Sequence, residues 1–257
     1  MKLIDVLVSQ SAETLNEISS KTNVMTDYHD IVIGMWIMAN HNPKHFLELG
    51  TGTAGWPISM HNALNLKDTR FTLIEDMSWG STNFEYRNEM YPKNFDELST
   101  IISNKTKTTM NFEIFKEVNL NTIKGYDTLR IDYDTSFEEF ENFIDNCSTN
   151  SVVFVDDFRF NISLKRVAYT MSLVFRKKLF PLWLGDQETA WVTNKQYRDY
   201  LLDIMHQQID QIKTLKVNPR YFKQGIIDDV DWRYINTRGS SDLLFTTHKE
   251  KLKNLRN

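Results

Sequence analysis

Apolar residues along this chain follow two patterns, short apolar runs and longer stretches with helical spacing. The short runs predict strands, and the run at 151–157 is almost wholly apolar, which is typical of a strand covered on both faces. The longer stretches predict helices between these strands. The predicted strands are 45–49, 70–75, 112–118, 126–132 and 151–157, and the predicted helices are 27–40, 55–66, 81–103, a segment ending at Cys147, 162–178 and 195–213.

Strands that alternate with helices indicate a parallel, doubly wound α/β sheet. Two further apolar runs, 180–184 and 189–193, flank Gly185 and Asp186 and predict a hairpin that turns the last strand antiparallel. We therefore expect a Rossmann-like, mostly parallel sheet of seven strands with a C-terminal antiparallel hairpin. The polar residues from Asp186 to Glu188 lie in the loop of this hairpin, which the topology places at the ligand edge, and are interpreted as a polar turn.

The length of 257 residues allows one large domain or two small ones, and no internal repeat or low-complexity linker divides the chain. We expect a single domain whose core covers about 27–193. A helical arm is predicted at 1–26 and an extension at 194–257, in which 232–247 is predicted to form a second hairpin.

Composition and charge exclude several classes of protein. Charged residues at 25% and a net charge of −4 are ordinary for a globular protein and give no basic field for nucleic acid. The most apolar run, 31–39, is too short to span a bilayer, and the first residues lack the apolar core of a signal peptide. Cys147 is the single cysteine, so neither an intramolecular disulfide nor a cysteine metal cluster can form. We expect a cytoplasmic protein with a small-molecule substrate and no nucleic-acid or membrane partner, and formation of a homo-oligomer stays open.

A glycine turn follows the first predicted strand. Gly50, Gly52 and Gly55 fit the Gly-x-Gly-x-x-Gly fingerprint of dinucleotide sites, and such a turn at the end of the first strand binds nucleotide-like cofactors. Glu48 argues against a dinucleotide, because its carboxylate would repel the pyrophosphate. The same carboxylate would attract a cofactor that carries an ammonium and a sulfonium group.

With Glu48, this stretch resembles the Glu-x-Gly-x-Gly motif of class I S-adenosylmethionine-dependent methyltransferases, except that Ala54 replaces the usual third glycine. The resemblance implies that S-adenosylmethionine binds at Glu48, Gly50 and Gly52. Glu75 ends the second predicted strand, at the spacing of an acid that accepts hydrogen bonds from the ribose hydroxyls. The alternative is a solvated acid. Trp56 and Trp79 are candidates to cover the adenine, with packing as an equal alternative.

Aspartates follow the fourth and fifth predicted strands. Since neighbouring parallel strands lie ~4.8 Å apart and end at the same edge, Asp132, Asp156 and Asp157 are expected to converge. Converging carboxylates repel unless a proton or a cation neutralises them, and oxygen ligands suit Mg²⁺ or a similar ion. The alternative is that these acids cap helices. A capping box predicted at Thr135 and Glu138 would leave Asp134 free to face the substrate.

The order Ile-Asp-x-Asp and then Val-Asp-Asp resembles the metal-dependent macrocin O-methyltransferase family over about 27–193. By this resemblance Asp132, Asp156 and Asp157 would be metal ligands, and Asp134 would be the catalytic base that removes the proton of a substrate hydroxyl. Tyr133 stands where the family usually has glycine. The resemblance implies O-methylation of a hydroxylated small molecule such as a sugar or a glycosylated metabolite.

Two other functions remain as alternatives. An NAD-dependent oxidoreductase would use the glycine fingerprint, but it has no use for three converging aspartates. A catalytically inactive S-adenosylmethionine-binding protein would fit the departures at Ala54 and Tyr133, although the retained acids argue against it.

Overall fold

A computed structural model describes residues 28–78, 91–117, 119, 123–158, 163–184 and 188–213. The predicted N-terminal arm, the second hairpin at 232–247 and Trp79 lie outside these residues. In the described part of the chain, no helix has the length and apolar character that crossing a membrane requires.

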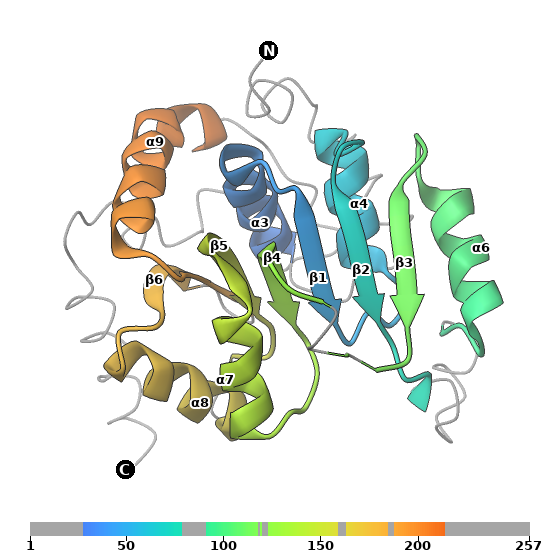
Figure 1. The fold of residues 1–257 in the computed structure, drawn as a ribbon. Coiled ribbons are helices and arrows are strands. Elements are labelled where there is room, and N and C mark those ends of the chain that lie inside the picture. The colour runs from blue at the N-terminus through green and yellow to red at the C-terminus, as the bar shows by residue number, and fades with distance from the viewer. Residues whose placement is uncertain are drawn as a thin grey trace, which may run out of the picture.

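Seven strands form the sheet at the centre of the molecule (Figure 1). They are β1 (His45–Leu49), β2 (Arg70–Ile74), β3 (Asn111–Phe115), β4 (Tyr126–Ile131), β5 (Cys147–Val155), β6 (Phe180–Leu184) and β7 (Thr189–Val192). Their order is β3-β2-β1-β4-β5-β7-β6. The first five strands are parallel to their neighbours, whereas β7 is antiparallel to both β5 and β6. The predicted doubly wound sheet with a C-terminal antiparallel hairpin is therefore confirmed.

The described helices connect these strands and cover both faces of the sheet. They are α3 (Tyr28–His41), α4 (Gly55–Leu64), α6 (Phe95–Lys105), α7 (Phe137–Asp145), α8 (Leu164–Phe175) and α9 (Lys195–Lys213). The prediction that the helix before β5 extends to Cys147 is wrong, because α7 ends at Asp145 and Cys147 already begins β5.

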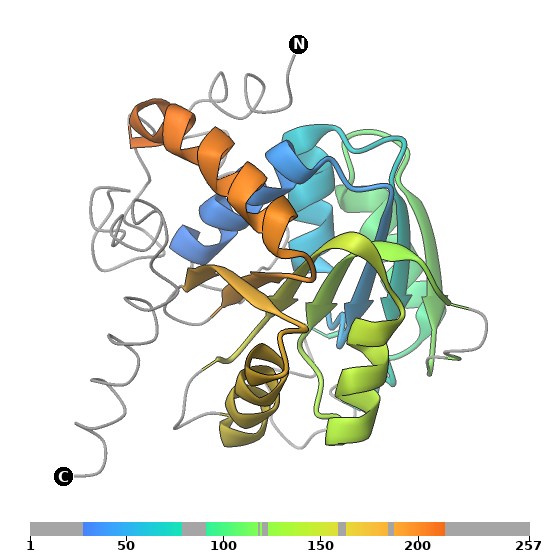
Figure 2. The same ribbon diagram turned by 60° about the vertical axis from the view of Figure 1, so that its left-hand side comes forward.

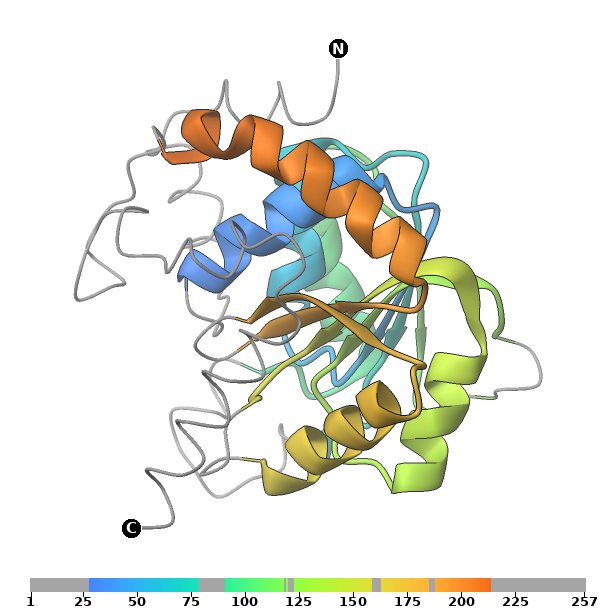
Figure 3. The same ribbon diagram turned by 90° about the vertical axis from the view of Figure 1, so that its left-hand side faces the viewer.

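Two hydrophobic cores lie on opposite faces of the sheet. Figure 3 shows α3, α4 and α9 on one side and α7 and α8 on the other, and Figure 2 shows α9 lying across α3. Strand residues alternate between the cores, so that Phe46 packs on the α3–α4 side and Leu47 on the α7–α8 side. By the same alternation Glu48, Arg130 and Glu188 point to the α3–α4 side.

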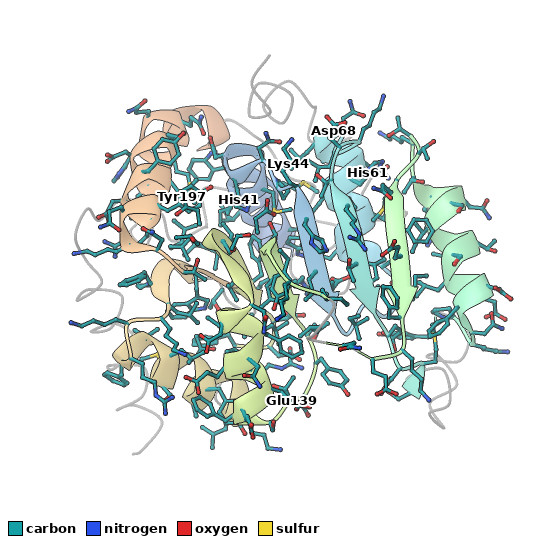
Figure 4. The ribbon with its side chains drawn as sticks, viewed as in Figure 1. His41, Lys44, His61, Asp68, Glu139 and Tyr197 are labelled. Carbon is teal, nitrogen blue, oxygen red and sulfur yellow. The ribbon has the colours of Figure 1, made fainter. Side chains whose placement is uncertain are left out.

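Two buried histidines hold helices in place. His41 Nδ1 lies 2.6 Å from the hydroxyl of Tyr197, and its Nε2 lies 2.8 Å from the carbonyl oxygen of Asp127. Figure 4 shows His41 and Tyr197 close together near Lys44, at the edge where β1 begins. His61 Nε2 lies 3.1 Å from the carbonyl oxygen of Thr108. Burial lowers the pKa of both histidines, which fits neutral packing partners.

Candidate functional site

The turn between β1 and α4 requires its glycines. Gly50 has φ 81° and Gly52 has φ 57°, in the left-handed region that favours glycine. A Cβ on Gly50 would lie 2.1 Å from the carbonyl oxygen of Asp132, so the turn packs directly against the end of β4. Ala54 also has a positive φ of 56°, which costs a non-glycine residue about 1–2 kcal/mol. This conformation gives a physical reason for glycine at the third position of the motif.

Glu75, directly after β2, forms hydrogen bonds with the backbone of the glycine turn. Its Oε2 accepts a hydrogen bond from the amide of Gly52 at 2.5 Å, and its Oε1 accepts one from the amide of Met77 at 2.9 Å. The side chain is buried, and burial raises its pKa. Both carboxylate oxygens can accept further hydrogen bonds. A role for Glu75 in binding ribose hydroxyls stays a prediction, but Glu75 is not a merely solvated acid.

Glu48 is fully buried beside the same turn. Its Oε1 accepts a hydrogen bond from Arg130 Nη1 at 3.1 Å, whereas Oε2 has no donor among the described residues. The hydroxyl of Thr51 lies near this carboxylate without forming a hydrogen bond of normal geometry. Burial raises the pKa of Glu48 to about 8, an effect that Arg130 opposes. The glycine turn therefore contains a buried carboxylate oxygen that lacks a donor.

Arg130 on β4 is the centre of a buried ionic cluster. Its Nε donates to Glu188 at 2.7 Å, its Nη2 to Asp156 at 2.7 Å, and its Nη1 to Glu48 at 3.1 Å and to Asp132 at 3.5 Å. Burial opposes the charged form, but the surrounding carboxylates raise the pKa of Arg130 well above its ordinary value. One permanently charged guanidinium therefore contacts four carboxyl groups, and burial raises the pKa values of Glu48, Glu188 and Asp132.

Glu188 corrects one interpretation from the sequence. It is fully buried, so the interpretation as a polar turn is wrong for Glu188, while Asp186 lies outside the described residues. Its Oε2 accepts a hydrogen bond from Trp56 Nε1 at 3.0 Å. The Trp56 ring stacks on Phe46 with centroids 5.5 Å apart and lies 5.4 Å from the guanidinium of Arg130. Trp56 therefore belongs to the core beneath the site, and it does not cover a cofactor base.

A second arginine, Arg166 on α8, lies between the predicted acids. Its Nη1 donates to Asp132 Oδ1 at 3.2 Å and to the carbonyl oxygen of Asp156 at 2.9 Å, and it lies 3.6 Å from Asp157 Oδ2. Its Nη2 lies 3.9 Å from Asp134 Oδ1. The structure thus brings together the four aspartates singled out in the sequence. We refer to Asp132, Asp156 and Asp157 as the aspartate cluster.

The aspartate cluster as placed does not fit a divalent cation. Asp156 Oδ2 accepts from Arg130, and its Oδ1 accepts from the amide of Asp157 at 2.9 Å, so each oxygen already accepts one hydrogen bond. Across the part of the chain that the structure describes, no group of three or more His, Cys, Asp or Glu side chains is arranged to hold a metal ion. The predicted Mg²⁺ site stays a prediction without support from these contacts.

Asp134 lies at the outer side of this cluster, with 76% of its side chain exposed. The predicted capping box is wrong by one residue, because Ser136 and Glu139 cap α7 instead of Thr135 and Glu138. The Glu139 amide donates to Ser136 Oγ at 3.2 Å, and the Ser136 amide donates to Glu139 Oε2 at 2.8 Å. Asp134 is therefore not needed as a cap, and its role as the base stays a prediction.

Sequence reasoning missed the residues that neutralise the acids. The position of Arg130 could have predicted a buried ion pair, because a charged residue between two apolar residues of a covered strand needs a buried partner. The position of Glu188 beside the apolar strand β7 is a weaker indication of the same kind. No sequence feature predicted an ion pair for Arg166, since an arginine in the first turn of an amphipathic helix is ordinarily solvated.

Comparison with known proteins gave only distant structural neighbours. No family model and no curated protein matches the chain. One solved neighbour is a methyltransferase from Geobacter sulfurreducens, with 12% identity and a TM-score of 0.47, covering 71% of this chain and 87% of the other. Another is the methyltransferase PaMTH1 from Podospora anserina bound to SAH, with 13% identity, a TM-score of 0.48, and 69% and 86% of the chains covered. A third is an O-methyltransferase from Bacillus cereus in complex with SAH, with 13% identity, a TM-score of 0.42, and 73% and 92% covered. The strand order and the antiparallel β7 give this chain the doubly wound, Rossmann-like sheet of seven strands that the sequence predicts.

Proposed function

We propose that this chain transfers the methyl group of S-adenosylmethionine to a hydroxyl oxygen of a small molecule. The observation that carries this proposal is Glu48 Oε2, a buried carboxyl oxygen beside the glycine turn that has no donor among the described residues. A buried polar atom without a partner is costly, and a cationic ligand would remove that cost. An anionic pyrophosphate would instead lie beside the acids around Arg130 and would oppose the ionisation of Glu48, which disfavours NAD.

The position of Asp134 after the end of β4 supports its role as the base. The Asp132 amide donates to the carbonyl oxygen of Leu49 at 2.8 Å, so the end of β4 is tied to the end of β1, where the glycine turn begins. Asp134 follows this point with an exposed carboxylate. S-adenosylmethionine supplies, when bound, a methyl group on a sulfonium. As the acceptor oxygen forms its bond to that methyl carbon, Asp134 takes the hydroxyl proton, and the products are a methyl ether and a neutral thioether.

For the methyl acceptor, we propose a chemical class and no individual compound. Tyr133, next to Asp134, is 42% exposed and presents an aromatic ring at the same edge. An aromatic ring beside the base supports a ring-shaped hydroxylated acceptor, such as a sugar or a glycosylated metabolite. A divalent cation is not part of this proposal, because the aspartate cluster is already paired with arginines.

Titration calorimetry tests the cofactor class directly. We expect S-adenosylmethionine and S-adenosylhomocysteine to bind in a one-to-one ratio and NAD not to bind. Glu48→Gln should weaken the binding of S-adenosylmethionine, because a cationic ligand favours the ionised form of Glu48 and an amide cannot ionise. Tight binding of NAD, with no response to either sulfur compound, would end the proposal. Methyl transfer from labelled S-adenosylmethionine to a panel of hydroxylated acceptors separates an enzyme from an inactive binding protein.

Glu75→Ala is expected to weaken the binding of S-adenosylhomocysteine by about 1–3 kcal/mol, because the amides of Gly52 and Met77 lose their acceptor. Glu75→Gln keeps one acceptor oxygen and should recover part of the affinity. Glu113→Ala is the matched control, since Glu113 is an exposed acid on the neighbouring strand β3 that pairs with Arg70. An affinity of Glu75→Ala equal to that of the control would show that the turn does not depend on Glu75.

A further inference from the structure

We propose that Arg130 and Arg166 take the place of a divalent cation at the aspartate cluster, and that methyl transfer by this chain needs no metal. The first half, that the arginines replace a cation, concerns the charges and geometry of the chain itself. The second half, that methyl transfer needs no metal, rests on the function proposed above. Together they assign two positioning residues that the resemblance to metal-dependent enzymes does not supply.

The first argument is electrostatic. A divalent cation would neutralise Asp132 and Asp156, but Arg130 already contacts both carboxylates, at 3.5 and 2.7 Å. Arg166 adds a second positive charge, 3.2 Å from Asp132. An arginine side chain in a protein does not lose its proton, so neither charge can be removed. A cation that entered the cluster would lie beside two fixed positive charges, which offset the attraction of the carboxylates.

The second argument concerns acceptor sites. A metal such as Mg²⁺ requires oxygen ligands at about 2.0–2.1 Å in near-octahedral geometry. Asp156 would have to give up its hydrogen bond to Arg130, and Asp132 would have to turn from both arginines. The Arg130 guanidinium is only 4% exposed, so it would lose its buried carboxylate partners without gaining water. Exchange of these contacts for a metal is therefore unfavourable.

The third argument is the position of Arg166. It bridges α8 to the ends of β4 and β5 through Asp132 and the carbonyl oxygen of Asp156, and its Nη2 faces Asp134. Here a guanidinium fixed by its own helix holds the strand ends together and positions the loop that carries the base.

Titration of the full-length protein with Mn²⁺, alone and with S-adenosylhomocysteine, tests the first half. We expect no stoichiometric binding below the millimolar range and no change of the melting temperature when a chelator or Mg²⁺ is added. One Mn²⁺ bound tightly by the wild type and lost in Asp156→Asn would overturn the proposal, because the aspartates would then be ligands.

The variant Arg166→Gln provides a sharper test, because it is expected to gain affinity for Mn²⁺. Removal of this guanidinium takes away one positive charge and its contacts with Asp132 Oδ1 and Asp157 Oδ2, so the affinity for Mn²⁺ should rise about tenfold or more over that of the wild type. Arg176→Gln is the matched control, because the half-exposed Arg176 caps the end of the same helix and pairs with Glu141 at the surface. A folded Arg166→Gln protein that gains no affinity would overturn the proposal. If this variant does not fold, Arg166→Ala and the wild-type titration decide the question.

Turnover in the presence of a chelator tests the second half. Methyl transfer should proceed at the same rate in excess chelator and in added Mg²⁺, and loss of activity in the chelator with recovery in Mg²⁺ would overturn metal-free transfer. Failure of S-adenosylhomocysteine to bind at all would end the proposed function. The Mn²⁺ titrations do not depend on that outcome and still decide whether the arginines occupy the metal position.

Discussion

Replacing Arg130 with Met is expected to destabilise the folded chain by about 3–5 kcal/mol, the usual cost of removing one partner of a buried ion pair. The guanidinium is 4% exposed and contacts four carboxylates, so its loss leaves several acids buried without a counter-charge. Urea unfolding at neutral pH measures the effect. Arg70→Met is the control, because Arg70 forms a half-exposed pair with Glu113 and should cost less than about 1 kcal/mol.

The same variant should show a characteristic dependence on pH. Burial already raises the pKa of Glu48 to about 8 and of Glu188 to about 7 in the presence of Arg130, and removal of Arg130 raises both further. A folded-state pKa above the unfolded value gives stability that is present at low pH and lost as pH rises through the folded pKa. The deficit of Arg130→Met relative to wild type should therefore be smaller at pH near 5 than at pH near 8. A deficit that is equal at both values would show that lost packing, and not unpaired charge, is its cause.

Asp134→Asn is expected to lower the rate of methyl transfer by about 10²–10⁴-fold, the usual contribution of a general base. The affinity for S-adenosylhomocysteine should not change, because that ligand is expected to contact Glu48, Gly52 and Glu75 instead. The folded state should also keep its stability, since the Asp134 side chain is 76% exposed and does not cap α7. Single-turnover kinetics with a saturating acceptor, together with calorimetry, separates the two effects.

Glu138→Gln is the control for Asp134→Asn, because Glu138 is an exposed acid in the first turn of α7 close to Asp134. It should keep the wild-type rate. Equal rates for Asp134→Asn and Glu138→Gln would remove Asp134 from the mechanism. A rate loss that disappears at high pH would instead show that the acceptor hydroxyl ionises without a base.

The sequence alone determined the architecture of this protein. Short apolar runs alternating with amphipathic stretches specified the strands and helices, because each face of a covered sheet must be apolar. The glycines at Gly50 and Gly52 specified the turn, since few other residues adopt a positive φ there at low cost. The convergence of Asp132, Asp156 and Asp157 also followed from sequence, because neighbouring parallel strands end at one edge.

Only the tertiary structure decided how the acids are neutralised. Arg130 reaches partners 82, 58 and 26 positions away along the chain, and Arg166 reaches Asp132 across 34 positions. Local patterns of polar and apolar residues do not predict contacts between residues so far apart in the chain. In the sequence, an aspartate that binds a metal cannot be distinguished from one that pairs with an arginine. The choice between cation and guanidinium depends on which side chains the folded strands bring within a few ångströms of each carboxylate, because electrostatic pairing acts through space.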